Sequence, residues 1–375
     1  MSVEQNGFRE VFNLEHHLTS EGGFTIGPYR ITVNRELIES DFARSQRLVF
    51  GSTFKSSGLK HAVTEEPASS GAWSVTAAVG EHEGLDQASV LLPKNPWVDG
   101  AYDLSVILSL LTGRHVRIGN DVEPYLTVSA GLALTSKNFF RTHPVIDWSL
   151  LPVLQAAGAG EAMEAVMLAM TSGNVAVKIA LASAALDGMN TKWFSTSDTN
   201  RYTKEVKETV KAAAQAFKAH LETARVNQDL IEDIMPRLGN VANESALAKL
   251  TAFLKAGGMY PENPDDEAPK RLQWLNKLRN AIAHSGSIKL DIAETPEVSI
   301  RVAGAVALLL QDICRIYIAK YLLKIADPGV DDAQRAVMTF FLSGKYNGQD
   351  ILTEDYEAYR LRLIDHYEEF GNIDL

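Results

Sequence analysis

Two adjacent segments of the chain are nearly apolar on every side of a helix, and they most constrain the fold. Residues 147–170 and 174–194 are rich in alanine, leucine and methionine. A helix without a polar face has to be buried, either inside a helical bundle or at an interface between subunits. The sequence therefore predicts a helical bundle built around these two segments.

Further helices are predicted after this pair, each with a recognisable start or stop. The segment 197–226 opens with capping residues and then places Val206, Val210, Phe217 and Leu221 at helical spacing. The other predicted helices cover residues 243–258, 264–286 and 297–325. Acidic residues and Pro269 stand near the start of 264–286 and Gly286 stands at its end, which is the expected polarity of a helix.

The first 145 residues follow a different pattern and are expected to be β-rich. Two glycine-punctuated runs in 22–37 predict a β-hairpin, and a helix is predicted over 102–113 with Gly113 as its stop. Further strand candidates are residues 72–83, 88–93, 114–119 and 124–134. The predicted fold class is α+β: a β-rich mixed domain over 1–145, a helical bundle over 146–326, and an acidic, partly helical extension over 327–375.

The charges are distributed unevenly. The chain has 36 Lys and Arg against 47 Asp and Glu, a net charge of −11. Residues 1–140 carry 11 − 16 = −5, residues 141–325 carry 21 − 20 = +1, and residues 326–375 carry 4 − 11 = −7. This balance argues against a globally basic nucleic-acid binder, but a local anion site in the near-neutral centre remains compatible with it.

The sequence indicates a soluble protein of a reducing compartment. The single cysteine excludes an intrachain disulfide, which favours the cytoplasm. The N-terminal segment contains acids and no apolar run typical of a secretory signal. The apolar tracts at 104–111 and 175–186 are too short or too interrupted to span a bilayer, so no membrane association is expected.

The stretch KLRNAIAHSG, residues 277–286, carries the main candidate for chemistry. The helix predicted over 264–286 has a stripe of apolar residues that is expected to face the core: Leu272, Leu275, Leu278 and Ile282. Asn280 and His284 are four residues apart and share the opposite face, with Lys277 close by. Arg279 lies roughly 140° from His284 around an ideal helix. Arg279 and His284 can therefore act on one substrate in three ways. Their side chains can extend far enough, the end of the helix can unwind, or a second copy of the chain can supply one of the two residues.

These residue types suit cleavage of an RNA phosphodiester. A histidine with an ordinary pKa of about 6.5 exchanges protons near neutrality, and an arginine binds phosphate oxygens with a planar fork. The RNA supplies its own nucleophile, the 2′-OH, so neither metal nor cofactor is required. The simpler interpretation is structural, because arginine and histidine in a last helical turn also stabilise the helix dipole.

The segment from about 160 to 325 resembles the HEPN superfamily of all-helical domains, which are defined by an R-polar-x-x-x-H motif. Arg279, Asn280 and His284 match that motif, and its setting near the end of a penultimate helix also matches. The resemblance implies a homodimer in which two motifs meet across the interface. Many such domains are metal-independent endoribonucleases of toxin–antitoxin, anti-phage or CRISPR-linked systems, whereas others are inactive modules that bind RNA, a nucleotide or a protein.

The resemblance also implies residue roles. His284 would be the general acid/base, Arg279 the phosphate clamp and Asn280 an orienting group. Asp187 stands where acidic residues sometimes line the family's cleft, although termination of a helix at Gly188 explains it equally well. Some toxins of the family carry a modifiable tyrosine two residues after the histidine, where this chain has Gly286. The N-terminal region is expected to recognise a trigger or ligand.

Three other features have both a functional and a structural interpretation. Lys204, Lys207, Lys211, Lys218 and Arg225 fall within an arc of roughly 60° on one predicted helix, which suits an RNA backbone or an ordinary solvated face. The stretch TGRHVRIGN, residues 112–120, suggests a turn into an edge strand, with anion contact as the alternative. No basic residue is placed to activate Cys314 in its apolar segment, so it is predicted to be a thiol buried in the core.

Overall fold

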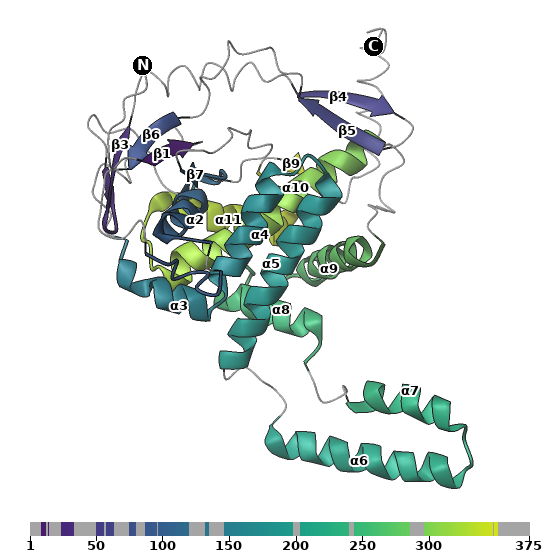
Figure 1. Ribbon diagram of the computed structural model, residues 1–375. Helices are drawn as coiled ribbons and strands as arrows, with labels where there is room; N and C mark the ends of the chain where they lie inside the picture. The colour runs from purple at the N-terminus through teal and green to yellow at the C-terminus, as the bar shows by residue number, and fades with distance from the viewer. Residues whose placement is uncertain are drawn as a thin grey trace, which may run out of the picture.

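The computed structural model describes most of the helical part of the chain and separate pieces of the N-terminal part. The described residues are 9–12, 14, 24–33, 50–55, 58–63, 75–79, 87–95, 97–119, 132–134, 146–197, 203–239, 244–285, 296–347 and 349–351. Within them the fold is α+β with a mostly helical body (Figure 1), which confirms the predicted fold class.

Five short strands of the N-terminal part form one antiparallel sheet. Its order is β2 (Phe24–Ile26), β3 (Tyr29–Val33), β6 (Val75–Val79), β1 (Arg9–Phe12) and β7 (Arg117–Ile118). The hairpin and two of the predicted strands are thereby confirmed, and β7 is an edge strand as expected. A separate hairpin of β4 (Phe50–Lys55) and β5 (Gly58–Val63) was not predicted.

The β2–β3 turn fastens the sheet to the helical part. Gly27 in this turn has φ of 54°, and a Cβ atom there would lie 2.2 Å from the Trp148 ring. Tyr29 meets the same ring edge-on, with 5.4 Å between the ring centroids. Glycine is required at this position because it tolerates both the positive φ and the close approach of the indole.

Helix α2 (Gly100–Thr112) confirms the helix predicted in this region. Asp99 caps its start by accepting a bond from the Ala101 amide, and Gly113 ends it with φ of 73°. The strand predicted over 88–93 is wrong: the segment forms bends and turns with one isolated bridge. The reason is Asp103 of α2, whose carboxylate accepts bonds from the Val90 and Leu91 amides and so replaces a strand partner.

The strand predicted over 124–134 lies mostly outside the described residues. Its last three residues, 132–134, are described and form no strand.

The two apolar segments form the centre of the body, as predicted. The first is divided into α3 (Leu151–Ala156) and α4 (Ala159–Thr171), and the second is α5 (Val175–Thr196). Gly158, with φ of 73°, separates α3 from α4. Helix α5 packs along α4 and against α10 (Pro296–Ile316), which continues into a π-helical turn over Tyr317–Leu322.

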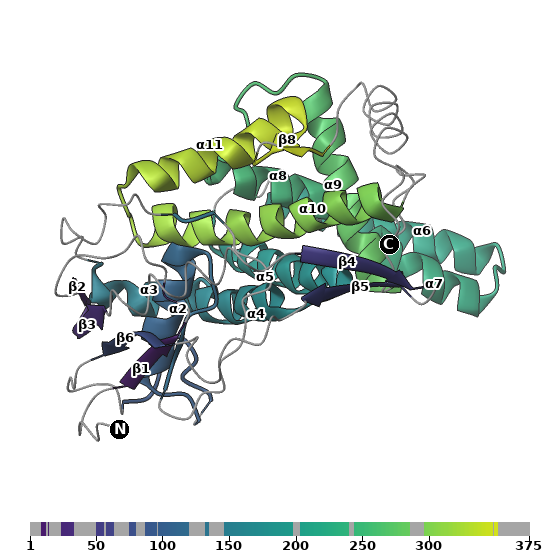
Figure 2. The same ribbon diagram turned by 90° about the horizontal axis from the view of Figure 1, so that it is seen from above.

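Three more helices complete the body. They are α8 (Ala246–Ala256), α9 (Glu267–Ser285) and α11 (Pro328–Ser343). Helix α11 packs on α9 and α10 and lies beside α10 when the molecule is seen from above (Figure 2). A short hairpin of β8 (Lys345–Tyr346) and β9 (Gln349–Asp350) follows.

One helical stretch among the described residues, Val302–Leu322, is long and apolar enough to cross a membrane. Its most apolar window is 89% buried inside the body. Most of this window is therefore covered by the protein's own residues.

Two helices stand apart from the body. Helix α6 (Lys204–Thr223) and helix α7 (Gln228–Gly239) pack mainly on each other and form a projecting hairpin (Figure 1). Helix α6 was predicted, but α7 was not. Ile231 of α7 is buried in this hairpin, whereas Val206 and Phe217 of α6 stay 40% and 42% exposed.

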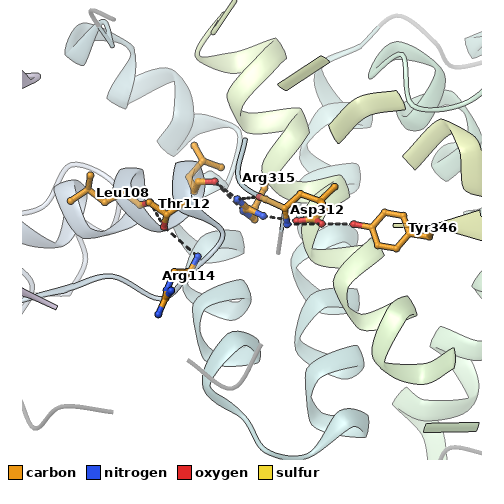
Figure 3. Close-up of polar contacts among 8 residues, drawn as sticks. Leu108, Thr112, Arg114, Asp312, Arg315 and Tyr346 are labelled. Atoms are coloured by element: carbon orange, nitrogen blue, oxygen red, sulfur yellow. Dashed lines mark hydrogen bonds and ion pairs between the residues drawn. The ribbon is translucent and has the colours of Figure 1, made fainter. Parts of the chain in front are cut away.

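A buried ion pair on α10 joins three distant parts of the chain (Figure 3). Arg315 and Asp312 are 0% and 1% exposed and form a salt bridge. Arg315 also donates to the Leu110 carbonyl at 2.6 Å and to the Leu132 carbonyl at 2.8 Å. Asp312 accepts bonds from the Leu132 amide and from the Tyr346 hydroxyl. The end of α2, residue 132 and β8 are therefore fixed to one turn of α10.

We expect Asp312→Asn to lower the free energy of unfolding by about 3–5 kcal/mol, because it leaves the Arg315 charge buried without its partner. Asp332→Asn is the matched control, since Asp332 pairs with Arg335 at the same sequence spacing but on the surface. We expect the control to cost less than about 1 kcal/mol. Urea unfolding followed by circular dichroism measures both, and equal losses would contradict this account of the pair.

Candidate functional site

The motif helix α9 has the predicted division between a buried and a polar face. Leu272, Leu275, Leu278 and Ile282 are all buried, which confirms the core-facing stripe. Lys277 and Asn280 are exposed, as expected for the opposite face. His284 belongs to the last turn of α9, but its side chain lies outside the described residues.

Arg279 lies between these two faces and is almost fully buried, with 4% of its surface exposed. Its guanidinium forms an ion pair and a hydrogen bond with the carboxylate of Asp187 on α5. The Asp187 side chain is 63% exposed, so the pair is buried on the arginine side and open to solvent on the carboxylate side. The Nε atom of Arg279 is also buried and has no hydrogen-bond partner among the described residues.

Asp187 does not mark the end of a helix. Helix α5 continues through Gly188 to Thr196, so the alternative that Gly188 terminates it is wrong. The helical backbone sets the direction in which the Asp187 side chain leaves α5, and the packing of α5 against α9 and α10 fixes the orientation of the helix itself. Asp187 is therefore held against Arg279 by the core and not by a loop.

Further polar side chains accompany Asp187 on α5. Ser183 and Asn190 stand four residues before and three residues after it, a spacing that places all three along one side of the helix. Both are buried, and the Ser183 hydroxyl and the Asn190 carbonyl oxygen have no hydrogen-bond partner among the described residues. Neither residue was predicted from the sequence, although their spacing around Asp187 was a usable signal.

Cys314 of α10 lies within electrostatic range of the ion pair. Burial raises the pKa of its thiol to about 12, while the nearby Arg279 charge lowers it and the Asp187 charge raises it by smaller amounts. The thiol is 0% exposed, which confirms the prediction of a core thiol. It is not a nucleophile in this site, because the thiolate is the reactive form.

The predicted RNA-contacting lysines are not part of this site. Lys204, Lys207 and Lys211 lie on α6, in the hairpin that projects away from the body (Figure 1). Lys204 lies within 4.0 Å of Glu208, and both side chains are largely exposed, which is typical of a weak surface pair. The other predicted site residues all belong to α9, where Lys277 and Asn280 are exposed and Arg279 is buried.

Helices α9 and α5 together present the buried guanidinium of Arg279, the exposed carboxylate of Asp187 and the exposed amide of Asn280. Arginine is a common ligand of phosphate oxygens, and the Asp187 carboxylate keeps the guanidinium of Arg279 in one orientation. Among the described residues no group of three or more His, Cys, Asp or Glu side chains is placed to hold a metal ion.

Comparison of the chain with family models, with curated proteins and with solved structures returns no match.

The buried position of Cys314 predicts that it is unreactive in the folded protein. Between an ordinary value of 9.0 and about 12, the pKa shift lowers the thiolate fraction at pH 8 about a thousandfold. We expect a thiol-specific disulfide reagent to react at least about a hundredfold more slowly with the native protein than with the protein in guanidinium chloride.

The same shift predicts a pH dependence. Above pH 9 the unfolded state loses the Cys314 thiol proton, whereas the folded state keeps it up to about pH 12. The stability that the protonated Cys314 thiol contributes is therefore fully present below pH 9 and is lost as the pH rises towards 12. Rapid thiol labelling of the native protein at pH 8 would contradict the buried position.

Proposed function

We propose that the protein is a cytoplasmic endoribonuclease of HEPN type, which cleaves RNA without a metal ion and acts as a homodimer. The observation that carries this proposal is the Arg279–Asp187 pair, which holds the arginine of the motif in one place between α9 and α5. Asn280 follows directly on the same helix, and His284 lies in its last turn. A stress or anti-phage role as a toxin follows from the resemblance.

Arg279 would bind the scissile phosphate. Its buried guanidinium is ordered before the substrate arrives, so little conformational entropy is lost when phosphate binds. The exposed Asp187 carboxylate leaves one side of the pair accessible to solvent. A phosphate oxygen would approach from that side and compete with Asp187 for the donors of Arg279.

His284 would transfer the protons. A base removes the proton of the 2′-OH, the 2′-oxygen attacks phosphorus, and the 5′-oxygen of the next nucleotide leaves with a proton from an acid. The products are a 2′,3′-cyclic phosphate and a 5′-hydroxyl. The position of His284 in the last turn of α9 favours its charged form, which suits the acid step.

A second copy of the chain would complete the site. Arg279 is directed into the body against α5, whereas Asn280 faces solvent one residue later. Because His284 is expected on the same helix face as Asn280, one helix directs Arg279 and His284 to different sides and cannot orient both towards one phosphate. Two motifs facing each other would supply an acid, a base and two phosphate contacts.

The lysines of α6 would act at a distance. Lys204, Lys207 and Lys211 lie on the projecting hairpin and would contact RNA that extends beyond the cleavage point. Lys277 lies on α9 itself, exposed near the motif, and would contact the phosphates next to the cleaved one.

The alternative is a non-catalytic HEPN module that binds RNA, a nucleotide or a protein. It is favoured by the net charge of −11, and by the partial neutralisation of Arg279 by Asp187. In that case the pair would serve as an anchor between two helices.

Cleavage of total RNA in excess chelator separates the two functions. We expect the wild type to cleave, and His284→Ala to lower the rate about a hundredfold to ten-thousandfold, the usual contribution of a general acid or base. Arg279→Lys keeps a charge for Asp187 but loses the planar fork, so a large loss of rate is expected there as well. Circular dichroism and thermal unfolding check that each variant is folded.

His220→Ala is the matched control, since His220 is an exposed histidine on α6 outside the motif. We expect it to cleave like the wild type. Equal cleavage by the wild type and all variants would refute the residue assignment. Tight RNA binding by a wild type that never cleaves would favour the non-catalytic module.

A further inference from the structure

A large cleft is lined by α4 and by the N-terminal part of the chain, whereas Arg279 lies on α9 and pairs with Asp187 of α5. Its volume is about 840 Å³, and its walls are formed by α4 on one side and by β1, α2 and β7 on the other. Small-molecule sites typically have volumes of about 300–1,000 Å³. The cleft includes His115 and Arg117, the part of the sequence for which anion contact was the alternative interpretation.

One part of the cleft is apolar and open to solvent. Trp97 at its edge is 92% exposed, and Leu168 of α4 is 50% exposed beside the buried Met167. An indole with this exposure contributes nothing to the core, so folding alone does not explain its presence. Flat aromatic groups stack on such a ring, and a base stacked on an aromatic side chain gains about 1–3 kcal/mol.

The α4 wall carries a carboxylate without a partner. Glu164 lines the cleft, is exposed and forms no ion pair or hydrogen bond within the described part of the chain. The hydroxyl of Tyr102, on the opposite wall, is buried and also has no hydrogen-bond partner there. Both groups line the cleft, Tyr102 from α2 and Glu164 from α4. Burial raises the pKa of Tyr102, and the negative charge of Glu164 raises it further. The Glu164 carboxylate accepts hydrogen bonds, whereas the protonated Tyr102 hydroxyl can both donate and accept.

The opposite wall carries the positive charge of Arg117. His115 beside it is neutral at pH 7, because burial and the Arg117 charge lower its pKa to about 4. His115 bonds to the Met167 backbone and thereby joins β7 to α4. Arg9, also in the cleft, forms a salt bridge with Asp99. The cleft thus presents an aromatic ring, a carboxylate on one wall and a guanidinium on the other.

We propose that this cleft binds a guanine nucleotide, with the base stacked on Trp97, the base edge bonded to Glu164 and the phosphate next to Arg117. Guanine has two adjacent N–H donors that match the two oxygens of a carboxylate, whereas adenine and cytosine present one amino group and uracil one imino group. Arginine is the preferred partner of phosphate. The nucleotide is either free or one unit of a single-stranded RNA, because both present the same groups.

Calorimetric titration with GMP, UMP and guanosine tests the proposal. We expect GMP to bind, and UMP to bind at least about tenfold more weakly because it lacks the second donor. Guanosine should also bind more weakly than GMP, since it lacks the phosphate. None of these ligands contains an internucleotide bond, so their binding is independent of the proposed ribonuclease activity. Equal binding of GMP and UMP would overturn the role of Glu164, and equal binding of guanosine and GMP that of Arg117.

Two exposed residues provide variants that should fold normally. We expect Glu164→Gln and Trp97→Ala each to weaken GMP binding about tenfold to a hundredfold, the usual effect of losing a charge-assisted hydrogen bond or a stacked base. Glu161→Gln is the matched control, because Glu161 is exposed one turn earlier on α4 and does not line the cleft. We expect the control to bind like the wild type.

A short single-stranded oligoribonucleotide with one central guanosine distinguishes the two sources. Tighter binding of the oligonucleotide than of GMP, lost in both variants, would assign the cleft to RNA. Tighter binding of GMP would assign it to a free nucleotide, and either result supports the proposal. Absence of binding by both probes, or binding that neither variant weakens, would overturn it.

Discussion

The buried pair of Asp312 and Arg315 is the interaction on which the rest of the structure depends. Two charges removed from water are costly unless their remaining hydrogen bonds are satisfied. Here the backbone at Leu110 and Leu132 and the hydroxyl of Tyr346 supply those bonds (Figure 3). Burial raises the pKa of Tyr346 well above its ordinary value, so its hydroxyl stays protonated and donates to Asp312. The pair thus fixes both the end of α2 and the chain after α11 to α10.

The candidate site depends on the same helix. Helix α10 packs along α5, and α5 directs Asp187 towards Arg279 of α9. The core therefore determines the position of Arg279. Cys314 connects this site to the buried pair, because it lies within electrostatic range of Arg279 and directly precedes Arg315. A guanidinium fixed in this way is suited to binding one phosphate in one geometry. The cleft shares this framework, since its wall is formed by α4, which packs along α5.

The sequence predicted the elements whose signals are local. The helix stop at Gly113 and the leucine stripe of α9 follow from helix capping and from helical periodicity. The strand expected over 88–93 failed because the distant side chain of Asp103 satisfies its amides. Helix α7 was missed because it contains Pro236, which disfavours a helix interior. The pairing of Arg279 with Asp187 joins residues 92 positions apart and has no local signal.

The central claim is that the motif on α9 cleaves RNA through the nucleophile that the RNA itself carries. Its most direct test compares one oligoribonucleotide with its fully 2′-O-methylated counterpart, both incubated with the wild-type protein in excess chelator. The account predicts cleavage of the unmodified strand, with a 2′,3′-cyclic phosphate at the new end, and no cleavage of the methylated strand. Cleavage of both strands, or of neither, would contradict it.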